Sequence, residues 1–138
     1  MIGIVIVTHA HLGEALIEAA RLIFDEMPES LVSVSIDLTH DVNRLRNKIK
    51  DAISAVDQNS GVLILTDMFG GTPSNLSYSF LEEGRIEVMS GVNLPVVIRA
   101  VNLRKRNPKL HDMAVVIEEY GKKSISLASD ILKGNKRG

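Results

Sequence analysis

The chain has 138 residues, a net charge of −1 and no cysteine. This length suits one domain with one core, the balanced charge gives no indication of nucleic-acid binding, and the missing cysteines exclude disulfides, thiolate catalysis and cysteine-based zinc sites. The longest apolar runs are too short to span a bilayer and no basic leader precedes them, so we expect a cytoplasmic protein.

Strand-like and helical segments alternate along the chain, and the apolar spacing predicts where each one lies. In chain order we expect strand Ile2–Thr8, a helix from Leu12 to Ile23, strand Leu31–Asp37, a helix from Val42 to Ile53, strand Gly61–Thr66, a helix that Thr72 caps and that Gly84 follows, strand Ile86–Ser90, a helix from its cap Asn93 to about Arg106, and a helix from Lys109 to about Leu127. This alternation indicates an α/β fold with a mostly parallel sheet. We expect a single domain over residues 1–130 and a flexible tail over 131–138.

The four strands differ in their apolar pattern, and the pattern predicts their order in the sheet. The first and third strands are continuously apolar, as expected of strands covered on both faces. The second and fourth alternate between apolar and polar residues, which suits the two edges. With right-handed crossovers these patterns favour an open sheet of order 2-1-3-4 with helices on both faces. The point at which ligands of such sheets bind then falls between the first and third strands.

A histidine and an aspartate follow these two central strands. His9 ends the first strand and Asp67 follows the third, so we expect the two side chains to meet at the carboxyl edge of the sheet. Neutral imidazole has one nucleophilic nitrogen, and a carboxylate on the other nitrogen fixes the tautomer and stabilises positive charge on the ring. The pair is therefore a candidate for carrying a phosphoryl group on histidine. Taken singly, each residue is also explained as the polar end of a strand.

The turn after Asp67 has the composition of an anion-binding site. Gly70 and Gly71 permit close approach of the backbone. Thr72, Ser74 and the first amides of the following helix can donate hydrogen bonds to phosphate oxygens. An ordinary strand-to-helix turn explains the same residues. The Gly-Lys-Ser/Thr of a Walker motif is missing, which argues against a nucleotide-hydrolysing P-loop.

Three further features each have two interpretations. His11 either steers a partner's phosphate at the rim of the site or shares a metal with His9; no third ligand has the characteristic spacing, so we predict neither a metal nor a cofactor. The basic residues between Arg99 and Lys109 either bind an acidic partner or form solvated surface. Met68 and Phe69 either pack inward or offer a docking surface to a partner protein.

Three segments together resemble the IIA component of the mannose-type sugar phosphotransferase system. They are Ile-Val-Thr-His9, Leu-Thr-Asp67-Met-Phe-Gly-Gly-Thr-Pro-Ser74 and Ser-Gly-Val-Asn-Leu-Pro95, and the resemblance covers residues 1 to about 130. It implies that His9 accepts a phosphoryl group through Nε2 from phospho-HPr and passes it to a IIB component. It also implies that Asp67 holds Nδ1 and that Thr72 and Ser74 lie near the phosphate. The family is dimeric and exchanges a C-terminal strand, for which the segment after Ala128 is the candidate.

Two departures from the family pattern concern the partners. Some members have glycine after the histidine, where this chain has Ala10 followed by His11. Other members continue into a IIB domain, whereas this chain stops, so we expect the IIB partner on a separate chain. The resemblance leaves a role in transport and a role in regulation both open, with association to a membrane permease peripheral at most.

Three other protein classes share parts of this pattern. A phosphoryl-donor subunit of dihydroxyacetone kinase also begins with a strand that ends in histidine. A response-regulator receiver needs an acidic pair after its first strand, where this chain has Thr8 and His9. A flavodoxin-like binding module needs a hydroxyl-rich phosphate loop, which residues 8–13 do not supply.

Overall fold

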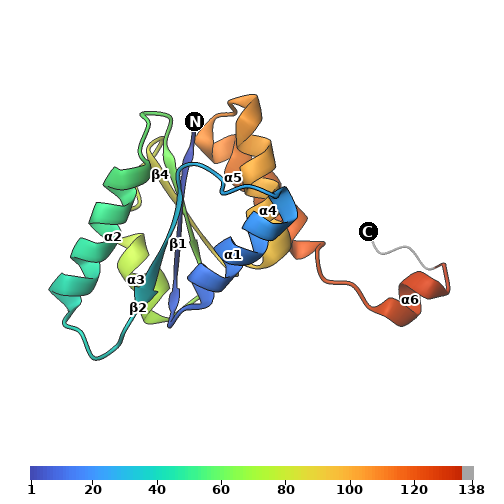
Figure 1. Cartoon of the computed structure of the whole chain (residues 1–138), viewed down its shortest axis with the longest axis horizontal. Helices are drawn as coiled ribbons and strands as arrows, with labels where there is room; N and C mark the ends of the chain where they lie inside the picture. The colour runs from blue at the N-terminus through green and yellow to red at the C-terminus, as the bar shows by residue number, and fades with distance from the viewer. Residues whose placement is uncertain (135–138) are drawn as a thin grey trace.

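A four-stranded parallel sheet forms the centre of the protein in the computed structural model, which describes residues 1–134 (Figure 1). The strands are β1 (Gly3–His9), β2 (Leu31–Ile36), β3 (Val62–Thr66) and β4 (Ile86–Ser90). They lie in the order β2-β1-β3-β4, and every neighbouring pair is parallel. The predicted order is therefore confirmed, with the two continuously apolar strands in the middle.

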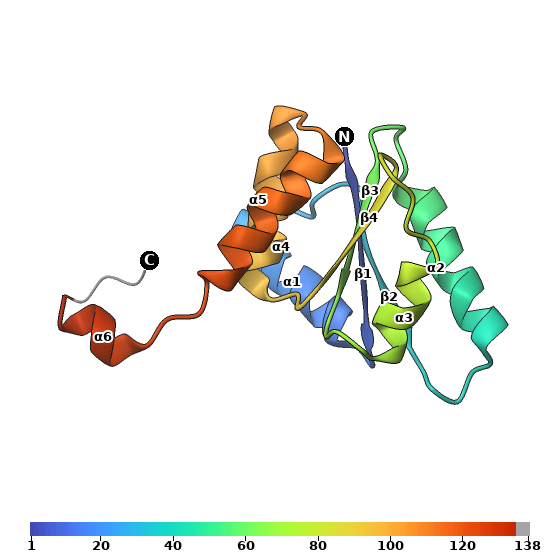
Figure 2. The same cartoon turned by 180° about the vertical axis from the view of Figure 1, so that it is seen from behind.

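Helices cover both faces of the sheet. One face carries α1 (Leu12–Phe24), α4 (Leu94–Leu103) and α5 (Leu110–Lys122), and the other carries α2 (Val42–Val56) and α3 (Thr72–Tyr78) (Figure 2). A short 3-10 turn, η1 (Arg104–Arg106), continues α4, and α6 (Ala128–Leu132) lies apart from the layers. Within residues 1–134, no helix combines the length and the apolar character that crossing a membrane requires.

Alternate residues of β1 supply the two halves of the core. Ile4 and Ile6 pack among the residues of α1, α4 and α5, whereas Val5 and Val7 pack toward α2 and α3. All four side chains are fully buried. Because successive side chains of a strand point to opposite faces, a strand with helices on both sides needs apolar residues at every position. This requirement is the physical reason for the continuous apolar run at the N-terminus.

Side-chain caps begin two of the helices as the sequence indicates. Asn93 accepts a hydrogen bond from the Val96 N–H at 2.9 Å, and Asp41 accepts one from the Arg44 N–H at 2.8 Å. Such caps satisfy N–H groups that have no partner within the first turn of a helix. The start of α1 is different, because the buried hydroxyl of Thr8 accepts from an N–H inside the helix. The strand end and the helix start around His9 are thereby tied together.

The structure differs from the sequence-based expectations at three places, one of which is the end of α5 at Lys122 instead of about Leu127. The cap of α3 is Gly71 rather than Thr72, and the helix already ends at Tyr78. The segment after Ala128, the candidate for a strand exchanged in a dimer, forms the helix α6 in the single chain, and this helix projects away from the sheet (Figure 1). A strand needs a sheet edge to pair with, and in the single chain this segment lies far from one. Of the expected tail, residues 135–138 lie outside the described part of the chain.

Candidate functional site

The imidazole of His9 and the carboxylate of Asp67 are in direct contact at the carboxyl edge of the sheet. Val7 of β1 lies opposite Thr66 of β3, so the residues that follow them emerge side by side. Oδ2 of Asp67 lies 2.8 Å from Nδ1 of the His9 ring and also accepts the main-chain N–H of His9 at 2.9 Å. Two segments that are 58 residues apart in the chain therefore share one carboxylate oxygen.

This contact decides which ring nitrogen of His9 is free to react. An ionised carboxylate only accepts hydrogen bonds, so Nδ1 must carry the proton and the lone pair of the neutral ring lies on Nε2. The side chain of His9 is 37% exposed, whereas that of Asp67 is 11% exposed. The arrangement presents a nucleophilic nitrogen to the outside and keeps the orienting acid behind it.

The pKa of Asp67 is set by opposing effects, of which burial is the largest. Burial of the carboxyl raises its pKa, but the hydrogen bonds from the main chain and the ring of His9, the charge interaction with that ring and a hydrogen bond from the Met68 N–H together outweigh it. The net effect is a pKa below the usual value. Asp67 is therefore an anion under all conditions in which a histidine ring titrates.

Gly71 packs directly against the outer edge of the His9 ring. A Cβ atom at this position would lie 2.8 Å from Cε1 and 3.4 Å from Nε2 of the imidazole. Its neighbour Gly70 has a φ of +86°, a left-handed conformation that other residues rarely adopt. Gly70 turns the chain back after Asp67, and Gly71 lets the start of α3 approach Nε2 of His9. The next residue, Thr72, is partly exposed.

Ser74 lies in a different place from the one its expected role requires. Its side chain is fully buried, and its hydroxyl donates a hydrogen bond to the main-chain carbonyl of Met68. The side chain therefore points into the protein, beneath the Asp67 turn, and its only proton is already in use. Phosphate binding by this hydroxyl does not fit the geometry.

Three further hydroxyls form a cluster with Ser74. The hydroxyl of Thr66 lies 2.6 Å from that of Ser74, and the hydroxyl of Ser90 lies 3.2 Å from it. Thr66 and Ser90 are 3.1 Å apart, and the phenol oxygen of Tyr78 lies 2.9 Å from Ser90. The one clue in the sequence is that Thr66 and Ser90 end neighbouring strands, where side chains of the same edge can meet.

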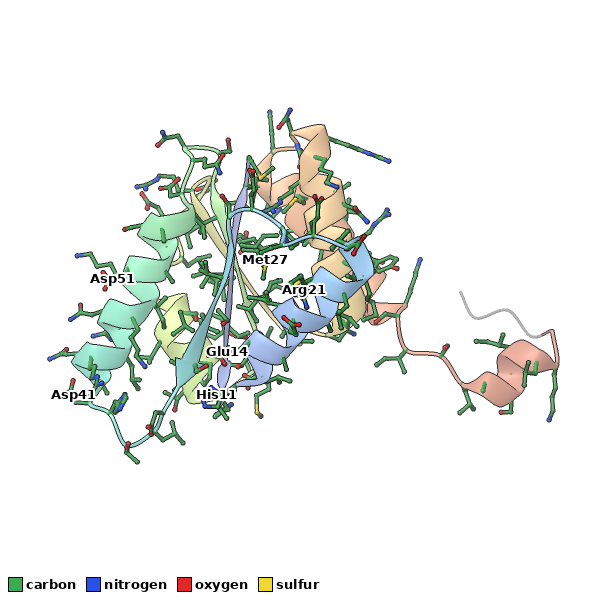
Figure 3. The ribbon with its side chains drawn as sticks, in the orientation of Figure 1. His11, Glu14, Arg21, Met27, Asp41 and Asp51 are labelled. Carbon is green, nitrogen blue, oxygen red and sulfur yellow. The ribbon has the colours of Figure 1, made fainter. Side chains whose placement is uncertain are left out.

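A cavity opens beside His9 toward β2 and the start of α2. Its lining includes His11, His40 and Lys48. His11 stands at the start of α1 near Glu14, with 3.5 Å between Nδ1 and Oε2, at the end of the sheet where the strands terminate (Figure 3). In residues 1–134 no group of three or more histidine, aspartate or glutamate side chains is arranged to hold a metal ion.

The structure shows where the Met68–Phe69 pair and the basic residues between Arg99 and Lys109 lie. Met68 and Phe69 are 53% and 78% exposed, so they face outward next to the site instead of packing into the core. The basic cluster is not one continuous surface, because Arg104 is only 2% exposed. Arg99 lies over the ring of Tyr120, 5.2 Å from its centroid.

Comparison with known proteins gives consistent matches. The family described as "PTS system fructose IIA component" matches residues 3–117. The PTS system fructose-specific EIIA component of Bacillus subtilis is 31% identical over 134 residues, which cover 96% of this chain and 90% of that protein. A crystal structure of the phosphotransferase system component EIIA from Streptococcus agalactiae superposes with a TM-score of 0.83 and 26% identity, covering 94% of this chain and 98% of that one.

One similar protein is much longer than this chain. The PTS system mannose-specific EIIAB component of Escherichia coli is 27% identical over 125 residues, which are 90% of this chain but 38% of that protein. The matches favour neither a subunit of dihydroxyacetone kinase nor a flavodoxin-like module.

Proposed function

This chain belongs to the fructose IIA component family of the sugar phosphotransferase system and is a phosphocarrier, and we propose that His9 is the residue that carries the phosphoryl group. The observation that supports this assignment is the 2.8 Å contact between Asp67 and Nδ1, which leaves Nε2 as the free nucleophile. A phosphorylated ring carries positive charge, and a carboxylate on its far side stabilises that charge.

The proposed step is a direct transfer between two imidazoles. The lone pair of His9 Nε2 attacks the phosphorus atom of a phosphohistidine on the donor protein. A new N–P bond forms on His9, the N–P bond of the donor breaks, and its electron pair returns to the donor ring. The proton on Nδ1 stays between His9 and Asp67, so no further acid or base is needed. In the second transfer a nucleophile of the acceptor protein attacks the same phosphorus atom, the N–P bond on His9 breaks, and its electron pair returns to Nε2.

Gly71 and Thr72 are the proposed surroundings of the transferred group. The N–H groups of a first helical turn have no partner within the helix and favour anionic oxygens. The hydroxyl of Thr72 is a further donor next to them. The close approach of Gly71 to Nε2 is what brings this turn within reach of a phosphoryl group on His9.

The proposed partners follow from the family. We assign HPr as the donor and a IIB component as the acceptor, both meeting the protein where Met68 and Phe69 are exposed. We also propose a single phosphocarrier domain over residues 1–130 that works as a homodimer in the cytoplasm. Ile125 and Leu132 are 80% and 85% exposed in the single chain, and burial of these side chains against a second copy would stabilise a dimer. Light scattering on the purified protein measures this, and a monomer mass would contradict it.

Labelling by phosphoenolpyruvate, enzyme I and HPr tests the assignment of His9. The wild type is expected to take up one acid-labile phosphate per chain, and His9→Ala none. His111→Ala is the matched control, since this histidine is exposed and also lies beside a carboxylate, with 3.4 Å between Nδ1 and Glu87. It should be labelled like the wild type. Full labelling of His9→Ala would overturn the proposal.

A further inference from the structure

The hydroxyl cluster of Thr66, Ser74, Tyr78 and Ser90 lies beneath the site without touching the reactive ring. Ser74 is fully buried at its centre, and its hydrogen bond ends on the Met68 carbonyl. We propose that Ser74 is a positioning residue, which sets the carboxylate of Asp67 against His9 by holding the main chain of Met68, the residue that follows Asp67. This inference rests on the proposed function of His9.

Met68, the residue that follows Asp67, is held at both of its main-chain polar groups. The N–H of Met68 donates to Oδ1 of Asp67 at 3.0 Å, and the carbonyl of Met68 accepts from Ser74. Oδ1 is therefore bound to its own turn, which leaves Oδ2 directed at His9. A shift of the Met68 main chain would move its N–H and rotate the carboxylate through this contact.

The remaining hydroxyls hold Ser74 itself and connect three elements. Because Ser74 gives its single proton to Met68, it can only be an acceptor toward the hydroxyls of Thr66 and Ser90, and the single proton of Thr66 is available to either Ser74 or Ser90. The carbonyl of Thr66 also accepts the N–H groups of Gly91 and Val92, at 3.0 and 2.9 Å. The end of β3 is thus bound to the end of β4 and, through Ser74, to α3. Chains of hydroxyls in a buried site polarise one another, so the cluster is stronger than its separate bonds.

A pair of serines on α3 offers a matched test. Ser74 and Ser77 are both fully buried, and both hydroxyls donate to a main-chain carbonyl. The bond of Ser77 stays inside the helix, on Pro73, at 2.6 Å, whereas the bond of Ser74 crosses to the Asp67 turn. Ser77→Ala therefore reproduces the loss of a buried serine hydroxyl without releasing the turn.

Two readouts separate positioning from general damage. In transfer from phospho-HPr, we expect Ser74→Ala to lower kcat about tenfold, because a small misplacement of a reacting group is costly. In NMR spectra, we expect the Nδ1–H proton of His9 to exchange faster with water in Ser74→Ala. Ser77→Ala should match the wild type in both measurements.

The outcomes distinguish this inference from the proposed function. If the wild type is not labelled on His9, the function fails, while the Nδ1–H exchange still tests whether Ser74 positions Asp67. If His9 is labelled and the two serine variants behave alike, the inference is overturned. Should Ser74→Ala not fold, Thr66→Val removes a hydroxyl from the same cluster with little change of shape, and we expect about a threefold loss of kcat. A wild-type kcat in that variant would overturn the inference as well.

Discussion

Asp67 contacts His9 at two points, the main-chain N–H and the ring nitrogen, and it does so with a single oxygen atom. The first contact fixes the end of β1 relative to β3, and the second fixes the rotation of the imidazole. A carboxylate that makes both contacts links the local fold to the orientation of the nucleophile. Removing its charge should therefore affect both stability and transfer.

Asp67→Asn is expected to slow phosphoryl acceptance by at least about 100-fold without unfolding the protein, because an amide can turn its N–H toward the ring and favour the wrong tautomer. The rate is measured by stopping the reaction with phospho-HPr at several time points and quantifying the phosphate bound to the protein. Acceptance at the wild-type rate would exclude Asp67 from the mechanism.

The lowered pKa of Asp67 also makes a prediction for stability. The pKa is lower in the folded protein than the value of about 3.9 in an unfolded chain, so the carboxylate stabilises the fold above about pH 4. That contribution is lost as the pH falls through the folded pKa. The free energy of unfolding in urea should therefore differ between wild type and Asp67→Asn by more just above about pH 4 than at more acid pH. A difference that grows in acid would contradict the assigned direction.

The imidazole–carboxylate pair was predictable because it depends on backbone topology alone. Strand order, read from apolar patterning, brings the ends of β1 and β3 together, and any side chains at those ends must meet. The direction of the Ser74 hydroxyl was not predictable. It depends on a side-chain rotamer and on Thr66 and Ser90, and these partners come from separate strands.

The turn between β3 and α3 is the element that brings the proposed phosphate-binding groups to the ring. Gly70 reverses the chain in a left-handed conformation, and Gly71 leaves no room for a side chain between the turn and the imidazole. The sequence suggested a permissive turn here, but only the structure shows that the close approach is to His9 itself.

Gly71→Ala is expected to push the imidazole away from its place and slow phosphoryl acceptance by about tenfold or more, because its methyl group would lie 2.8 Å from Cε1 of His9. Gly71 does not have a positive φ, so the backbone itself accepts alanine without strain. Thermal unfolding should show a folded protein, and transfer kinetics should show the loss. A folded variant with the wild-type rate would mean that the ring does not need this contact.

The edge strands and the C-terminal segment show where sequence patterns suffice and where they do not. The alternation in β2 and β4 correctly indicated the edges, since each edge strand is less completely covered. The segment after Ala128 carries exposed apolar residues, including Ile131 and Leu132, whose packing depends on what they meet. A pattern of five residues does not decide between helix and strand, because periodicity needs a longer window.

At the scale of the whole molecule, the candidate site lies at the carboxyl end of the sheet, and a buried arginine lies at the opposite end. At the amino ends of the strands, the buried guanidinium of Arg104 donates to the carbonyls of Ile2 and Ser30 at 3.1 Å each and to that of Glu29. Burial lowers the pKa of Arg104, with a smaller opposing effect from Glu29. This side chain joins the end of α4 to the loop that enters β2.

Arg104→Met is expected to reduce the free energy of unfolding by about 3 kcal/mol, because it removes the guanidinium donor from three carbonyls, of which that of Ser30 keeps the Ile4 N–H. Arg106→Met, at an exposed position of the same turn, is the control and should change it by less than about 0.5 kcal/mol. Urea denaturation measures both. Equal free energies of unfolding in the two variants would show that Arg104 does not stabilise this end of the molecule. Phosphoryl acceptance should be normal in both variants while they are folded.

Locating the phosphoryl group on the ring of His9 tests the central claim most directly. Protein labelled with ¹⁵N on histidine and phosphorylated by phospho-HPr should show phosphorus coupled to Nε2 of His9, while Nδ1 keeps a proton bound to Asp67. Phosphorus on Nδ1, or on any other residue, would contradict the account, because the carboxylate of Asp67 occupies the side of the ring on which Nδ1 lies.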